Sequence, residues 1–168
     1  MSRKVVLSNS VTAFLKYDSH YILIKRSPNK DIAPNVWSGV GGRTEPHEIN
    51  DPALACLREI YEETGITSEH ISNLELRYIV IRRAKNTIRQ SYIYFGKTDI
   101  PHVIDTEEGT LHLIDEKDLM DRAFTQTFGA MLKHYINTPD EQGRVVVGIA
   151  ERVDGGLHMS WSIVEDFE

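Results

Sequence analysis

The chain has 168 residues, of which 40% are hydrophobic and 26% are charged, so its length and composition favour a single soluble globular domain, residues 1–168. The formal net charge of −6 argues against binding to nucleic acid or to an anionic membrane, because both require basic patches. The single cysteine, Cys56, excludes an intrachain disulfide framework. Because no apolar run is long enough to span a bilayer and the first residues lack a signal-peptide core, we expect a cytoplasmic protein.

The first part of the chain predicts a β-hairpin followed by a glycine-rich loop. Residues 5–15 and 21–25 are rich in β-branched side chains and flank a turn at 17–20. Arg26, at the end of the hairpin, is either solvated or a charge-assisted donor to a phosphate. After a loop at 27–36, residues 37–43 (WSGVGGR) carry three glycines in four positions, where a backbone bends tightly or is approached closely.

Residues 51–65 (DPALACLREIYEETG) predict an α-helix. Asp51 can cap its N-terminus with the carboxylate, Pro52 suits the first helical position, and Gly65 suits the left-handed residue just past the end. At about 100° per residue, one side of this helix is apolar. Its expected members are Ala53, Leu54, Leu57, Ile60, Tyr61 and Thr64.

Three glutamates gather on the opposite side of this helix. Glu59, Glu62 and Glu63 stand at i, i+3 and i+4, where like charges repel by roughly 0.2–0.5 kcal/mol per pair. They also lie near the helix C-terminus, where the dipole favours cations. The cluster is therefore either a solvated acidic face or a set of hard oxygen ligands for Mg²⁺ or Mn²⁺. Arg58 stands at the border, four residues before Glu62.

The rest of the chain is mostly strand. Residues 74–83 and 88–97 predict a second hairpin, whose tip gathers Arg82, Arg83, Lys85 and Arg89 as a solvated surface or as a phosphate-facing patch. A strand at 110–114 is followed by a short helix at 116–120, capped by Asp115, and a longer helix at 128–136. Residues 144–153 and 157–164 predict a third hairpin around an Asp-Gly-Gly turn. Helices packed on a strand-dominated sheet make the fold class α+β.

Residues 42–66 (GRTEPHEINDPALACLREIYEETGI) resemble the signature of the Nudix hydrolase family. That signature is Gly, five residues, Glu, seven residues, Arg-Glu, an aliphatic residue, one residue, Glu-Glu, one residue, Gly and an aliphatic residue. Gly42 and Glu48 match its opening, and the close is matched by Arg58-Glu59-Ile60, Glu62-Glu63 and Gly65-Ile66. The chain departs from it by having nine residues between Glu48 and Arg58; the extra two fall within residues 49–51, where they lengthen a loop and leave the helix phase unchanged.

The resemblance implies a fold and an activity. The expected fold is a mixed β-sheet sandwiched between helices, and the expected reaction is hydrolysis of a nucleoside diphosphate linked to a further group X. The resemblance covers about residues 5–136. The extension from about residue 138 to 168, with the third hairpin, is expected to form a homodimer contact, a lid or an extra sheet edge.

The resemblance also implies residue roles. Glu59, Glu62 and Glu63 are expected to bind Mg²⁺, with Mn²⁺ as the substitute, and Glu59 or Glu62 to place or deprotonate the attacking water. Arg58 is expected to orient these carboxylates, and Glu48 either to act through Arg58 or to bind metal more loosely. The Gly41 carbonyl and Glu108 are expected as further metal ligands, with Glu107 as the alternative to Glu108. The expected substrate contacts are Arg26, Gly42, Arg43 and Trp37. Trp37 and Phe128 are the candidates for contacts with the base.

Residues 41–46 (GGRTEP) are similar to the usual Gly-Gly-basic-x-Glu entry of the family. The segment around Trp37 and the Glu-Glu-Gly stretch at 107–109 are similar to its MutT-like branch. That branch implies a small-molecule substrate, a nucleoside triphosphate, oxidised or not, cleaved to the monophosphate and pyrophosphate. ADP-ribose or another nucleotide sugar is the alternative substrate. A catalytically silent nucleotide-binding sensor is a third interpretation, against which the retained glutamates argue.

Overall fold

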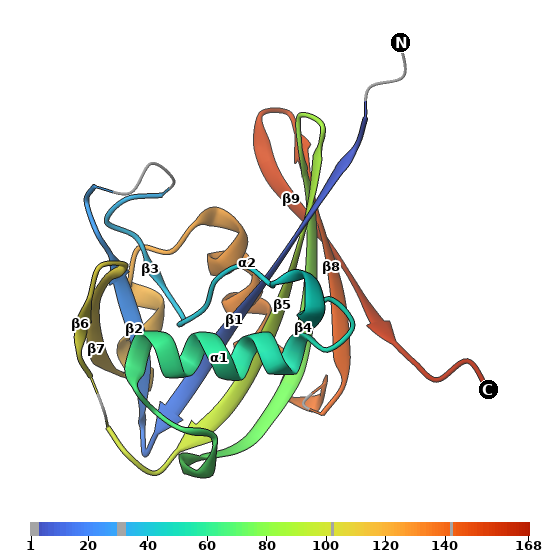
Figure 1. Ribbon diagram of the computed structural model, residues 1–168. Coiled ribbons are helices and arrows are strands. Elements are labelled where there is room, and N and C mark those ends of the chain that lie inside the picture. Colours follow the sequence, from blue (N-terminus) through green and yellow to red (C-terminus); the bar gives the residue numbers. More distant parts are fainter. Residues whose placement is uncertain (1–3, 30–32, 102, 142) are drawn as a thin grey trace.

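The computed structural model describes residues 4–29, 33–101, 103–141 and 143–168, and the nine strands in these residues form one mixed sheet (Figure 1). The sheet order is β6-β7-β2-β1-β5-β4-β8-β9, and β3 pairs with β2. The strands are β1 (Val6–Tyr17), β2 (His20–Arg26), β3 (Trp37–Ser38), β4 (Ile71–Ala84), β5 (Thr87–Thr98), β6 (Asp105–Thr106), β7 (Gly109–Asp115), β8 (Val145–Val153) and β9 (Gly156–Val164).

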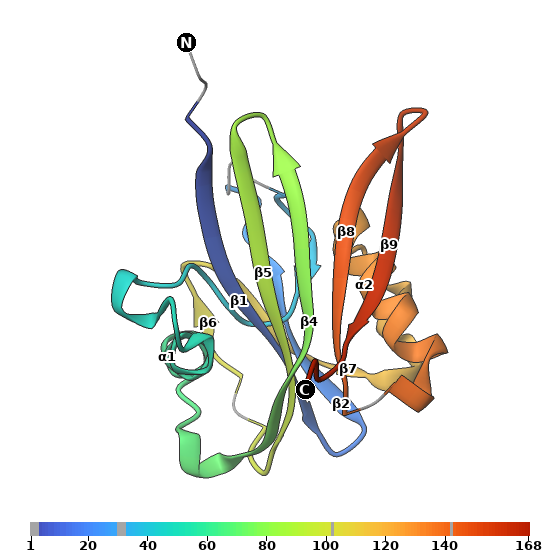
Figure 2. The same cartoon turned by 90° about the vertical axis from the view of Figure 1, so that its right-hand side faces the viewer.

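Helices cover the two faces of this sheet. The helix α1 (Pro52–Thr64) lies on one side and α2 (Gln126–Asn137) on the other, as Figure 2 shows. Alternate residues of β1 pack against the helices on opposite faces of the sheet, because successive side chains of a strand point to opposite faces. Val11, Ala13 and Leu15 belong to the apolar cluster that includes residues of α1, whereas Phe14 belongs to the one that includes residues of α2. The predicted α+β fold, a mixed sheet between helices, is confirmed.

The three predicted hairpins are present. The first is β1–β2, the second is β4–β5, and the third is β8–β9. β8 pairs in parallel with β4, so the third hairpin forms the extra sheet edge among the roles expected for it. No helix in the described part of the chain is long and apolar enough to cross a membrane.

A fork in the sheet positions the glycine-rich segment. β1 and β2 pair only where Leu15–Tyr17 meets His20–Ile22, and the two strands then separate. Beyond that point β1 bridges Val40 and Arg43, and the backbone N–H of Val11 donates to the Gly42 carbonyl at 2.9 Å. The glycines therefore lie in the fork, alongside a strand that is paired on its other edge with β5.

The helices differ from their predictions in two details. The side chain of Asp51 makes no capping hydrogen bond, although Pro52 begins α1 and Gly65 follows it in the left-handed conformation with φ 73°. The segment after Asp115 is a 3₁₀ helix, η3 (Glu116–Asp121), capped as expected by the Asp115 carboxylate. The remaining 3₁₀ helices in the described residues are η1 (Pro46–Glu48), η2 (Ser68–His70) and η4 (Pro139–Glu141).

The predicted apolar side of α1 was also wrong in part. Leu54 and Tyr61 are 52% and 57% exposed, whereas Ala55, which was not among the predicted members, is buried. Glu63, expected on the outer side, is only 7% exposed. The helix is thus rotated relative to the pattern of its apolar residues, because Gly41 and Gly42, which have no side chains, leave room for carboxylates next to the backbone. This rotation turns part of the acidic cluster inward.

Candidate active site

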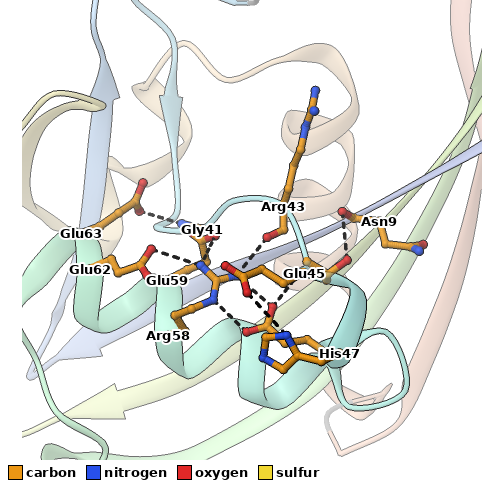
Figure 3. A network of polar contacts seen from close by, with 11 residues as sticks. Asn9, Gly41, Arg43, Glu45, His47, Arg58, Glu59, Glu62 and Glu63 are labelled. Atoms are coloured by element: carbon orange, nitrogen blue, oxygen red, sulfur yellow. Dashed lines mark hydrogen bonds and ion pairs between the residues drawn. The ribbon is translucent and has the colours of Figure 1, made fainter.

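Arg58 is the centre of the polar network on α1 (Figure 3). Its Nη1 donates to Glu59 Oε1 at 2.8 Å and to Glu62 Oε2 at 3.1 Å. Its Nη2 also donates to the Arg43 carbonyl at 3.0 Å, which ties the helix to the glycine-rich segment. One guanidinium therefore holds two of the predicted metal-binding carboxylates, the arrangement expected for an orienting residue.

Glu48 completes this network despite the two extra residues that follow it. Arg58 Nε and Nη2 donate to the two Glu48 oxygens at 2.8 and 2.9 Å, a bidentate pairing. The Glu45 N–H donates to the same carboxylate at 2.8 Å. These bonds, with that from Arg58 first, lower the pKa of Glu48 to about 2. The extra residues form a turn in which the Asp51 N–H donates to the Glu48 carbonyl at 2.9 Å, so the insertion is absorbed before α1 begins.

Glu63 lies on the inner side of the cluster. Its Oε2 accepts a hydrogen bond from the Gly41 N–H at 2.7 Å. Burial raises the pKa of Glu63 to about 8, the Gly41 N–H opposes this, and the negative charges of Glu59 and Glu108 add to it. Burial also raises the pKa of Glu59, although Arg58 opposes the shift. Carboxylates held so close with little water favour either a proton or a cation.

The glycines at the fork leave the space that these carboxylates occupy. A Cβ on Gly42 would lie 2.5 Å from both Glu59 oxygens, and a Cβ on Gly41 would lie 2.1 Å from the Val11 carbonyl oxygen. Among the hydrogen bonds of the described residues, none involves the Gly41 carbonyl oxygen. Glycine at these two positions therefore brings backbone against β1 on one side and carboxylates on the other.

Gly42→Ala tests this packing. The added methyl group must displace the Glu59 carboxylate, so we expect hydrolytic activity to fall about tenfold or more while the fold persists, because a shift of about 1 Å at a reacting centre is costly. Gly129→Ala is the matched control, since its Cβ would meet only Phe124 Cβ at 4.0 Å. Steady-state rates and the Tm of both variants are the measurements. Wild-type activity in Gly42→Ala would contradict the close approach.

A cavity of about 710 Å³ joins this cluster to the strands. It is lined on the acidic side by all three α1 glutamates and by Glu107 and Glu108, which precede β7. The predicted substrate contacts Arg26, Gly42, Arg43 and Trp37 also line it, together with Phe128 at the start of α2. The structure thus brings the candidate residues to one cavity, with Glu48 behind Arg58.

Two arginines that line the cavity were expected from the sequence to lie elsewhere. Arg82 and Arg89 were expected at a solvated hairpin tip, with a phosphate-facing patch as the alternative, and both line the cavity. Arg83, between them in the same cluster, is exposed and donates to the Lys85 carbonyl at 3.0 Å. The hydroxyls of Ser8, Ser10 and Ser91 line the cavity beside these arginines and were missed. The alternation of strand residues could have separated Arg82 from Arg83, but only the pairing of β1 with β5 brings the serines to them.

Trp37 is half-buried, and it packs against the apolar cluster that includes residues of α2 as well as beside polar groups. Its ring meets His112 edge-on with centroids 5.0 Å apart, and Lys25 Nζ and Arg122 Cζ lie 5.9 and 5.7 Å from its centroid. Such contacts hold the indole at the wall of the cavity by cation–π attraction.

The residues of this site suit a divalent cation. Carboxylate and carbonyl oxygens are the ligands that Mg²⁺ and Mn²⁺ prefer, and the cavity supplies five carboxylates and an uncommitted Gly41 carbonyl. As they stand, no three acidic, histidine or cysteine groups in the described residues are close enough to share one ion. Arg58 and the Gly41 N–H hold the carboxylates in separate hydrogen bonds, which side-chain rotation would exchange for a metal.

Comparison with known families identifies the family of the chain. The family model described as NUDIX domain matches residues 7–128. The chain belongs to the Nudix family. Members are hydrolases that act on pyrophosphate bonds of nucleoside diphosphate derivatives and use divalent metal cations. The match begins in β1 and ends in α2, so β8 and β9 lie outside it. No curated protein sequence matches the chain.

Solved structures share the fold. The MutT protein of Bacillus halodurans superposes with a TM-score of 0.67 at 18% identity, over 93% of this chain and 97% of that one. The MutT protein of Methanosarcina mazei Go1 gives a TM-score of 0.67 at 20% identity, over 82% and 99% of the two chains. A C. elegans Ap4A hydrolase gives a TM-score of 0.59 at 20% identity, over 81% of this chain and 98% of that one. At these identities the likeness establishes the fold of this Nudix hydrolase.

Proposed function

We propose that this Nudix hydrolase is a Mg²⁺-dependent pyrophosphohydrolase of nucleoside triphosphates, which releases the monophosphate and pyrophosphate. One observation carries the proposal: a single cavity is lined by the carboxylates of the Nudix signature, by four arginines and by the aromatic side chains of Trp37 and Phe128. Metal and arginine together can neutralise a triphosphate in a protein whose net charge is −6.

The contacts of these residues support the roles that we propose for them. Glu59, Glu62 and Glu63 would hold Mg²⁺, with the Gly41 carbonyl and Glu108 as further ligands. When bound, the cation would supply Lewis-acid stabilisation of the phosphates and a more acidic water. Glu59 or Glu62 accepts the proton of the attacking water, and Arg58 sets the orientation of both. Glu48 acts through Arg58, since both of its oxygens are bonded to that guanidinium.

The substrate contacts lie on the other walls of the cavity. Arg26, at the end of β2, and Arg43, beside the fork, are placed to donate to phosphate oxygens. Figure 3 shows the Arg43 side chain extending away from the carboxylates, so its charge is directed to a different part of the cavity from theirs. Trp37 and Phe128 supply flat apolar surface for a base.

A panel of nucleotides tests the function. Nucleoside triphosphates, their oxidised purine forms and ADP-ribose are each incubated with the wild-type protein and Mg²⁺, and the products are resolved by chromatography. We expect pyrophosphate and a nucleoside monophosphate from the triphosphates. Faster cleavage of ADP-ribose would move the assignment to nucleotide sugars, and tight nucleotide binding with no turnover of any substrate would favour the sensor.

Glu62→Gln tests the metal assignment. Glu62 is about half exposed and keeps a hydrogen-bond acceptor after this change, so the fold should be unaffected. We expect Mg²⁺-dependent hydrolysis to fall by about 10²-fold or more, as for the loss of a ligand or general base. The measurement is the initial rate across a Mg²⁺ titration. A near wild-type rate in this variant would show that the assignment is wrong.

A further inference from the structure

Arg82 and Arg89 face each other directly across the β4–β5 hairpin. Like charges at directly opposed positions of a sheet destabilise it. No hydrogen bond or ion pair to either guanidinium is found in the described residues. Loss of water around the guanidinium and the charge of Arg89 both lower the pKa of Arg82, which remains exposed at the mouth of the cavity. The pair is therefore an uncompensated concentration of positive charge in an acidic protein.

Strand register places a third arginine on the same face of the sheet. Ser10 pairs with Ser91 on β5 and, on its other side, with Arg43. Arg89 is two residues before Ser91, and residues two apart on a strand point to one face. Arg43, Arg89 and Arg82 thus share a face with the serine hydroxyls between them, and the Ser10 and Ser91 hydroxyls are 3.0 Å apart. We name this surface the arginine trough: Ser8, Ser10, Arg43, Arg82, Arg89 and Ser91, all lining the cavity.

The trough runs away from the carboxylates. The Cα of Arg89 stands two strands from that of Arg43 and two residues further toward the hairpin tip, which is about 12 Å at ordinary strand spacing and rise. The residues that define the trough carry hydroxyl and guanidinium groups, with Val80 beside them on β4, whereas the aromatic side chains Trp37 and Phe128 belong to β3 and α2. Arginine forks and hydroxyls are donors matched to phosphate oxygens. The trough accordingly suits phosphate that is separated from the scissile bond.

We propose that the arginine trough binds the phosphate-bearing end of group X and that the Arg82–Arg89 pair selects substrates with phosphate beyond the scissile diphosphate. The inference rests on the proposed function and narrows its substrate class. It orients the substrate in the cavity, with the nucleoside toward Trp37 and Phe128 and the chain of phosphates passing the carboxylates toward the β4–β5 tip.

Binding of inorganic tripolyphosphate tests the trough without turnover. Isothermal titration calorimetry is run in metal-free, low-salt buffer on the wild-type protein, on Arg82→Gln/Arg89→Gln and on Arg83→Gln. Arg83 is the matched control, since it stands next to Arg82 on β4, is exposed and does not line the cavity. We expect the double variant to weaken binding about tenfold or more and the control to change it less than twofold. Equal weakening in both, or in neither, overturns the proposal.

Kinetics separate this inference from the proposed function. With Mg²⁺, the double variant should raise KM about tenfold for an adenosine tetraphosphate and leave KM for ADP-ribose, whose X carries no phosphate, within twofold. An equal rise for both substrates overturns the selection. A wild-type protein that binds tripolyphosphate through Arg82 and Arg89 but hydrolyses no nucleoside triphosphate would refute the proposed function and leave the phosphate site standing. The Tm of the double variant should not fall, because the substitution removes opposed like charges.

Discussion

Glu59→Gln is expected to lower kcat by about 10²- to 10⁴-fold at saturating Mg²⁺, the range for loss of a general base. The side chain of Glu59 is only 13% exposed, lies against Gly42 and is held by Arg58 Nη1 at 2.8 Å. Glutamine keeps the shape and an acceptor for Arg58 but removes the charge that would bind the cation or take a proton. The activity loss should therefore come with an intact fold.

The thermal stability of the Glu59→Gln variant distinguishes a chemical role of Glu59 from a structural one. Burial first, and then the charges of Glu62 and Glu48, raise the pKa of Glu59 despite the opposing effect of Arg58, so the fold opposes its ionisation. We accordingly expect the Tm of metal-free Glu59→Gln to equal or exceed that of the wild type. Glu69→Gln is the control, because Glu69 is a largely exposed glutamate on η2 outside the cavity. A variant that keeps more than a tenth of the wild-type kcat would remove Glu59 from the reaction.

The metal-free protein is expected to lose stability as the pH rises from about 4.5 to about 8. Glu63 has an ordinary pKa of 4.5 and a folded-state pKa of about 8, raised first by burial. Below 4.5 it is protonated in both states and contributes nothing. Between the two values the folded protein retains a proton that the unfolded chain has released, so each increment of pH favours unfolding, and above 8 the penalty is complete. The raised pKa of Glu59 acts in the same direction.

Differential scanning calorimetry in EDTA between pH 5 and pH 8.5 measures this dependence. Glu63→Gln should flatten it, because the amide replaces the group that titrates. Glu48 does not interfere, since its pKa is lowered from 4.5 to about 2 and its contribution to stability is therefore complete and constant above pH 4.5. A wild-type Tm that is constant or rises over this range would contradict the burial of Glu63, and an unchanged slope in Glu63→Gln would assign the effect to another group.

Metal binding should reverse the effect of pH. Because a cation binds the ionised carboxylate, Mg²⁺ added at pH 7 should displace a proton from Glu63 and raise the Tm. Calorimetric titration in two buffers of different ionisation enthalpy measures the proton release. If the Glu63→Gln variant releases no proton on binding Mg²⁺, the proton released by the wild type comes from Glu63.

The amino-acid sequence alone was enough to predict the three hairpins, the helix at Asp51–Gly65 and the Nudix family. Hairpins depend on strand-forming runs around turn residues, and the Asp154-Gly155 turn joins β8 to β9 as predicted. The closing part of the Nudix signature, from Arg58 to Glu63, lies within one helix, where positions i, i+3 and i+4 are neighbours whatever the helix packs on. Local geometry therefore carried the prediction of Glu59, Glu62 and Glu63 as one cluster.

Only the tertiary structure decided which way that cluster faces and what lies opposite it. The apolar pattern of α1 placed Glu63 outward, but the room left by Gly41 and Gly42 turned it inward. Likewise the sequence placed Arg82 and Arg89 at a basic hairpin tip, and the pairing of β5 with β1 and with β4 brings them beside Ser8 and Ser10. Both outcomes depend on contacts between segments far apart in the chain, which the spacing of residues along a single helix or strand does not encode.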